Sequence, residues 1–173
     1  VDLEDEELGR ILGIAVRDVD EHTLLGARGF DQLAQAARDF VFLEELPRLF
    51  DHFPASEHPR DRRFRSVAED VENLARENNL ALINLAASCL EEGEAYVEIG
   101  VYHGASLVSA MLGNEGTRFV GVDSFGFRDA SLEKVEANLA RYGLEVPEIV
   151  VGDAFELLPS GALGETRVGV WYY

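Results

Sequence analysis

The sequence is poor in cysteine, in lysine and in long apolar runs. Cys89 is the only cysteine among 173 residues, so an internal disulfide and a cysteine-based metal cluster are excluded. No stretch approaches the roughly 18 uncharged apolar residues of a membrane span. The opening residues, VDLEDEEL, are too acidic for a signal peptide. These absences predict a cytoplasmic protein with no membrane partner.

Positive charge is also scarce. Fifteen basic residues face thirty-three acidic ones, which gives a formal net charge of −18. Such a balance repels nucleic acid and anionic lipid surfaces. The one basic cluster, PRDRRFR at residues 59–65, is interpreted as a solvated loop between helices. Nucleic-acid and membrane partners are therefore not expected, and a homo-oligomer is compatible with the sequence.

The first half of the chain has helical spacing. Asp31 is a good cap for the run QLAQAARDFVFLEEL. Ser66 is expected to cap a longer helix whose apolar face includes Val67, Val71 and Cys89 and which ends at Gly93. Residues 1–93 are therefore predicted to form a helical extension or cover.

From residue 94 onward, strand-like and helix-like runs alternate. The predicted strands are AYVEI, RFVGV, EIVV and RVGVWYY, and the predicted helices are ASLVSAML and DASLEKVEANLARY. This alternation predicts an α/β domain over residues 94–173, with a Rossmann-like, doubly wound parallel sheet of about four strands. A sheet of this class normally continues, so we expect a fragment of a longer protein or a sheet that a partner completes.

Carboxylates stand where three predicted strands end. Glu98 closes the first strand, Asp123 follows the second, and Asp153 follows the third. The carboxyl ends of parallel strands meet at one edge of the sheet, which is where ligands bind in such folds. The three acids are therefore expected along one ligand-binding edge.

The stretch VEIGVYHGAS, residues 97–106, links the first strand to a helix. Gly100 and Gly104 allow a sharp turn and a close ligand approach, and the helix starting near Gly104 directs N–H groups to the site. A dinucleotide site prefers G-x-G-x-x-G with no acid facing its pyrophosphate. Here the spacing is G-x-x-x-G with Glu98 before it, which favours a ligand with cationic groups and hydroxyls. S-adenosylmethionine fits this description.

The next two strand ends suit the rest of that cofactor. Asp123 stands at the distance from the first motif where an acid meets a ribose in nucleotide folds. The segment GDAF, residues 152–155, follows the third strand, where an adenine would lie and where Phe155 could cover its face. Each feature also has a purely structural reading, in which the glycine motif is a turn, Asp123 a loop acid and Asp153 a helix cap.

Taken together, Glu98 to Gly104, GVDSF at residues 121–125 and VVGDAFELLP at residues 150–159 resemble the first three motifs of class I S-adenosylmethionine-dependent methyltransferases. EIGVYHGAS is similar to the first motif of catechol-type small-molecule O-methyltransferases and of bacterial enzymes that methylate macrolide sugars. The resemblance covers residues 94–173. It implies cofactor contacts from Glu98, Gly100, Tyr102, Gly104 and Ser106 to the methionine end, from Asp123, Ser124 and Phe125 to the ribose, and from Asp153, Ala154 and Phe155 to the adenine.

The catalytic group is left open. His103 is a candidate general base, with a polar wall contact as the alternative. Tyr173 is a candidate for the acceptor pocket. In the metal-assisted branch of the family an aspartate after the fourth strand binds the metal; a divalent metal is thus compatible, but its ligands are not identifiable in this sequence. The predicted function is methyl transfer to a hydroxyl of a small molecule. The alternatives are a non-catalytic Rossmann-like binding or assembly module and a nicotinamide-dependent oxidoreductase.

Overall fold

A computed structural model describes residues 41–56 and 58–173. The helix expected after Asp31 begins outside these residues, and within them residues 41–49 are helical. A search of the described helices for one of sufficient length and apolarity to cross a bilayer found none.

Four parallel strands form the sheet. They are β1 (Glu94–Ile99), β2 (Arg118–Asp123), β3 (Glu148–Val151) and β4 (Arg167–Tyr172). Their order is β3-β2-β1-β4, so β1 lies between β2 and β4, and all pairs are parallel. Glu98 is in register with Gly121 on β2 and with Tyr172 on β4, which brings the carboxyl ends of the strands to one edge. The predicted α/β Rossmann-like sheet is confirmed.

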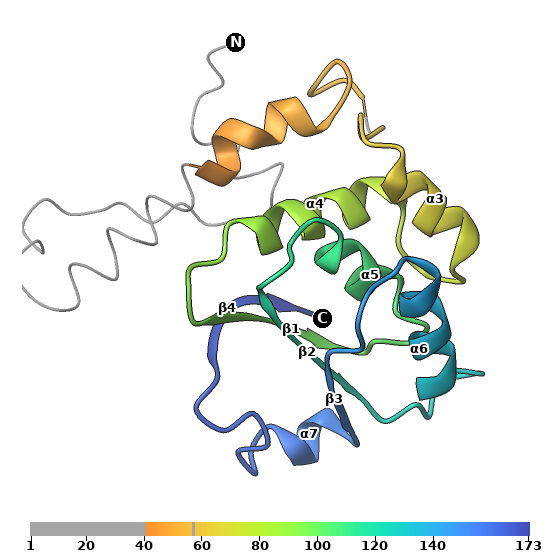
Figure 1. Ribbon diagram of the computed structural model, residues 1–173, viewed down its shortest axis with the longest axis vertical. Coiled ribbons are helices and arrows are strands. Elements are labelled where there is room, and N and C mark those ends of the chain that lie inside the picture. The colour runs from red at the N-terminus through yellow and green to blue at the C-terminus, as the bar shows by residue number, and fades with distance from the viewer. Residues whose placement is uncertain (1–40, 57) are drawn as a thin grey trace, which may run out of the picture. The chain divides into compact units, whose positions relative to one another are not determined.

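Helices cover the two faces of the sheet unequally (Figure 1). They are α3 (Arg63–Asp70), α4 (Glu77–Ser88), α5 (Ala105–Met111), α6 (Leu132–Arg141) and the short α7 (Ala154–Leu157). In Figure 1, α4 and α5 lie on one side of the strands and α7 on the other. Connections that change face between β2 and β4 are the feature of a doubly wound sheet.

All residues of β1 are buried, because this strand has neighbours on both edges and cover on both faces. Tyr96 packs into the large core shared with α3, α4 and α5. Ala95 and Val97 point to the opposite face, where they pack with Val120 and the partly buried Leu163. The helices α3 and α4 thus share one core with the sheet. The division of the chain at residue 94 into a cover and a cofactor half stays a prediction.

The expected helix from Ser66 to Gly93 is wrong. Ser66 lies inside α3, and the chain is extended at Val71 (φ −112°, ψ 120°) before α4 begins at Glu77. The side-chain amide of Asn73 donates to the carbonyls of Ala68 (3.1 Å) and Val71 (2.6 Å), which ends the first helix. Asparagine competes with helical hydrogen bonds in this way. The resulting loop, residues 71–76, reaches the ligand edge of the sheet.

The packing of Ile149 and Val101 over β2 depends on a glycine in that strand. A methyl group at Gly121 would lie 2.7 Å from Ile149 Cδ1 and 2.8 Å from Val101 Cγ2. We expect Gly121→Ala to lower the free energy of unfolding by about 1–3 kcal/mol, because the buried Val101 and the partly buried Ile149 must move. Denaturant unfolding measures this change. Gly126→Ala is the control, since its methyl group would meet only Ser124 Oγ at 3.4 Å. Equal stabilities for the two variants would contradict the packing account.

Candidate cofactor site at the carboxyl edge of the sheet

The loop between β1 and α5 turns through residues of positive φ. Gly100 and Gly104 both have φ +86°, and Tyr102 between them has φ +55°. The N–H of Gly100 donates to the carbonyl of Val122 (2.9 Å), which fixes the start of the loop on β2. A methyl group at Gly104 would approach Val135 Cγ1 to 3.2 Å, so both space and conformation favour glycine there. The loop predicted from the glycine spacing is therefore present.

Asp123 organises two loops at once. Its Oδ2 accepts the backbone N–H of Tyr102 (2.8 Å), and its Oδ1 accepts the backbone N–H of Phe125 (2.6 Å). Asp123 thus fills the structural role of a loop acid. Each carboxylate oxygen can accept a further hydrogen bond, so the same group retains capacity for two ligand hydroxyls.

Glu98 is fully buried rather than exposed at the edge. Its carboxyl group accepts hydrogen bonds from the hydroxyls of Tyr96 (2.7 Å) and Ser106 (2.5 Å). Burial raises the pKa of Glu98 to about 7, against the lowering effect of these two donors. Ser106 contacts this carboxyl group and lines the first of the two cavities described below, whereas Glu98 itself does not line it.

Two cavities meet at this edge. The first, of about 370 Å³, lies between the loop at residues 71–76, the β1–α5 loop and the end of β4. The second, of about 440 Å³, lies across the ends of β2, β3 and β4. Gly100 and Tyr173 border both cavities. The two cavities are therefore neighbours at the end of β1.

The predicted site residues divide between the two cavities. Those lining the first are Gly100, Tyr102, His103 and Ser106, and those lining the second are Gly100, Asp123, Ser124, Asp153, Ala154 and Phe155. Glu98 and Gly104 lie behind these walls. Asp153 also caps α7, since its Oδ1 accepts the N–H of Phe155 (2.8 Å). The Phe155 side chain is 83% exposed, so its ring has a free face toward solvent.

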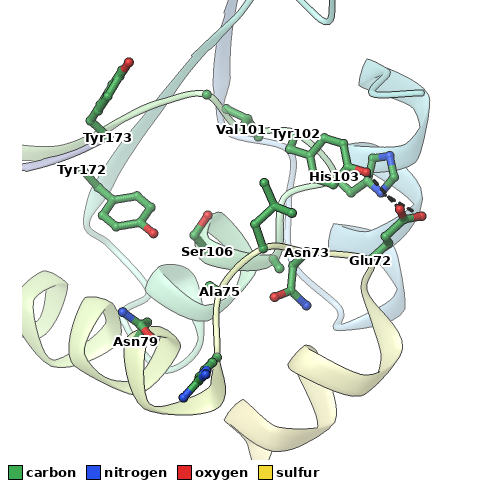
Figure 2. Close-up of a pocket in the computed structure, with 14 residues that line it drawn as sticks. Glu72, Asn73, Ala75, Asn79, Val101, Tyr102, His103, Ser106, Tyr172 and Tyr173 are labelled. Atoms are coloured by element: carbon green, nitrogen blue, oxygen red, sulfur yellow. Dashed lines mark hydrogen bonds and ion pairs between the residues drawn. The ribbon is translucent and has the colours of Figure 1, made fainter. Parts of the chain in front are cut away.

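His103 forms part of a wall. It is 3% exposed, and its ring stacks on that of Tyr102 with centroids 3.9 Å apart. Figure 2 shows this pair beside Glu72 at one end of the first cavity, with Tyr172 and Tyr173 at the other end. The Tyr102 hydroxyl donates to Glu72 Oε1 (3.0 Å). This position agrees with the wall contact that the sequence left open beside catalysis.

Sequence reasoning missed the contribution of the loop at residues 71–76. Glu72, Asn73 and Arg76 line the first cavity together with Asn79 from the first turn of α4. The signal for this loop was Asn73, which interrupts an otherwise regular helical spacing. The first cavity is therefore built partly from the segment expected to be a cover.

Comparisons with known proteins give a limited likeness to solved structures. No protein-family model matches the sequence, and no curated protein matches it. One solved structure with a similar arrangement is coclaurine N-methyltransferase bound to N-methylheliamine and S-adenosylhomocysteine, at 12% sequence identity and a TM-score of 0.34. The match covers 72% of this chain and 44% of that protein, so the chain spans less than half of its length. A likeness of this size does not bear on activity.

Proposed function

We propose that this chain binds S-adenosylmethionine along the carboxyl edge of the sheet and transfers its methyl group to a hydroxyl of a small molecule. The observation that carries the proposal is the pair of cavities that both border Gly100, with Asp123 in one and Ser106, backed by Glu98, in the other. The sequence motifs assign the ribose and methionine ends of the cofactor to these same two places.

The second cavity suits an uncharged nucleoside better than a nucleotide. Its polar side chains are Asp123, Ser124, Asp153 and Tyr173, and its lining contains no arginine or lysine. A pyrophosphate there would face two carboxylates without a compensating cation. This composition supports an adenosine without phosphate and disfavours a nicotinamide dinucleotide.

In this reaction the chain would bind the cofactor, align the acceptor and remove the acceptor's proton. Asp123 would hold the ribose, and Ser106 and the Gly100–Gly104 loop would hold the methionine end. When bound, the cofactor supplies a methyl group on a cationic sulfur, a leaving group that is already reactive. Alignment of the acceptor oxygen with that methyl group then provides most of the acceleration. The acceptor must also lose a proton to a base or to a metal-bound group, and His103 is a titratable residue of the first cavity.

The direct test is calorimetric titration of the folded chain with S-adenosylhomocysteine, with NADH as the comparator. We expect S-adenosylhomocysteine to bind at one site and NADH to bind at least about 10-fold more weakly, because its pyrophosphate meets the acidic wall. Transfer of a labelled methyl group to a panel of small polyhydroxylated compounds then tests the reaction. Tighter binding of NADH would favour the oxidoreductase alternative. Cofactor binding without transfer to any hydroxyl compound would favour the non-catalytic module.

A further inference from the structure

Three side chains with metal-ligand atoms converge beside the first cavity. Glu72 comes from the loop after α3, His103 from the loop after β1, and Asp129 from the connection between β2 and α6. One ligand atom of each lies within 4.8 Å of those of the other two. These residues are separated by about thirty positions in the sequence, so only the fold brings them together.

The imidazole of His103 is buried, and its polar contacts are long. Its Nδ1 atom is 3.9 Å from Glu72 Oε2, which is longer than a hydrogen bond. Its Nε2 atom is 3.4 Å from the Asp129 carbonyl, 3.5 Å from Asp129 Oδ1 and 3.4 Å from Lys134 Nζ. The two nitrogens of this buried ring thus face different carboxylates, and a single cation can take one of them as its ligand. Such a group can accept a ligand that shortens these contacts.

Charged groups of both signs surround the ring. The Tyr102 hydroxyl lies 3.0 Å from Glu72 Oε1 and 3.5 Å from Asp129 Oδ1, so both carboxylates approach the same point. Lys134 forms an ion pair with Asp129. The Lys134 ammonium group and, beside the Tyr102 hydroxyl, the Arg128 guanidinium therefore face the two carboxylates. The Lys134 side chain is 43% exposed, so it can turn away into solvent without a large loss of buried contact.

We propose that Glu72, His103 and Asp129 bind a divalent cation of the first transition row. When the cation is absent, the Lys134 ammonium group neutralises part of the charge of these ligands through its ion pair with Asp129. One imidazole nitrogen with two carboxylate oxygens is a donor set that Zn²⁺ and Mn²⁺ accept. Ligand bonds of about 2.0–2.2 Å require the ligand atoms to lie about 3–4 Å apart. The exposed Glu72 and Asp129 side chains, at 63% and 58%, can make that small movement.

The cation would face the first cavity, because Glu72 and His103 both line it. Three protein ligands leave coordination positions open for water or another oxygen. If the proposed methyl transfer holds, an acceptor hydroxyl bound there would have a lowered pKa and would lose its proton more readily. That extension rests on the proposed function, whereas cation binding itself does not.

The test is titration of the full chain with Mn²⁺. Binding is measured as the loss of the electron paramagnetic resonance signal of the free ion. Without S-adenosylhomocysteine present, the result is independent of the cofactor proposal. We expect one Mn²⁺ per chain, and we expect Glu72→Gln and Asp129→Asn each to weaken binding about 10-fold or more. Both residues are exposed, so these variants should fold. Glu136→Gln, an exposed change on α6, is the control and should bind like the unaltered chain.

Lys134→Met distinguishes two interpretations of this cluster, a metal site and an ordinary ion-pair network. Removal of the competing ammonium should raise the affinity for Mn²⁺ several-fold, and a network without a metal function would show no binding in either protein. The proposal is overturned if the folded chain takes up no Mn²⁺, or if Glu72→Gln and Asp129→Asn bind Mn²⁺ as the Glu136→Gln control does.

Discussion

Replacement of Asp123 with alanine is expected to lower the affinity for S-adenosylhomocysteine about 100-fold. Two ribose hydroxyls donating to one carboxylate contribute roughly 1.5–3 kcal/mol each, so their combined loss amounts to two or more factors of ten. The same change also frees the N–H groups of Tyr102 and Phe125 that Asp123 holds. Calorimetric titration at constant salt measures the affinity.

The loss of affinity that comes from disturbed loops must be distinguished from the loss of the contact with the ribose. Asp123→Asn keeps one side-chain oxygen to accept a backbone N–H but loses the second. Its affinity for S-adenosylhomocysteine should lie between those of the unaltered protein and Asp123→Ala. Glu145→Ala removes an exposed carboxylate elsewhere and should bind normally. Near-ultraviolet circular dichroism checks that the variants remain folded. Undiminished binding by a folded Asp123→Ala protein would exclude the ribose role.

Replacement of Glu98 with glutamine is expected to change how stability depends on pH. The pKa of Glu98 is raised from an ordinary 4.5 to about 7, mainly because the carboxyl group is buried. The folded state therefore holds this proton more tightly than the unfolded state. The associated stabilisation is present below pH 4.5 and is lost as the pH rises to about 7 and above. Over that window the free energy of unfolding should fall by about 3 kcal/mol.

Glutamine has the same shape and cannot ionise. Relative to the unaltered protein, Glu98→Gln should therefore gain stability between pH 5 and pH 8, by up to about 3 kcal/mol. Urea unfolding at several pH values gives this difference, in which the other titrating groups largely cancel. Glu145→Gln controls for the loss of one negative charge, since its side chain is exposed. A difference between Glu98→Gln and the unaltered protein that stays constant with pH would contradict a buried, partly protonated Glu98.

The sheet was predictable because its signals are local. Strands buried on both faces appear as short apolar runs, and parallel pairing requires the helices that the sequence places between them. The positions of Asp123 and Asp153 followed from the rule that parallel strands end at one edge. The glycine spacing predicted the β1–α5 loop for a similarly local reason: only particular residues tolerate positive φ.

The remaining features depend on contacts that sequence spacing does not reveal. Val71 and Leu74 preserve a helical pattern, yet Asn73 ends the helix and Leu74 is 72% exposed. Glu98 was expected at a ligand surface, but hydroxyls from Tyr96 and Ser106 stabilise it inside the core. The group formed by Glu72, His103 and Asp129 joins three separate connections, and none of them predicts it alone.

Tyr102 connects residues of the two cavities at the carboxyl edge. Its backbone N–H donates to Asp123, its ring stacks on His103, and its hydroxyl donates to Glu72. If the proposed nucleoside binds Asp123 and the proposed cation binds Glu72 and His103, both ligands bind residues that contact Tyr102. Linkage requires any such effect to be reciprocal: the factor by which the cation changes nucleoside affinity equals the factor by which the nucleoside changes cation affinity.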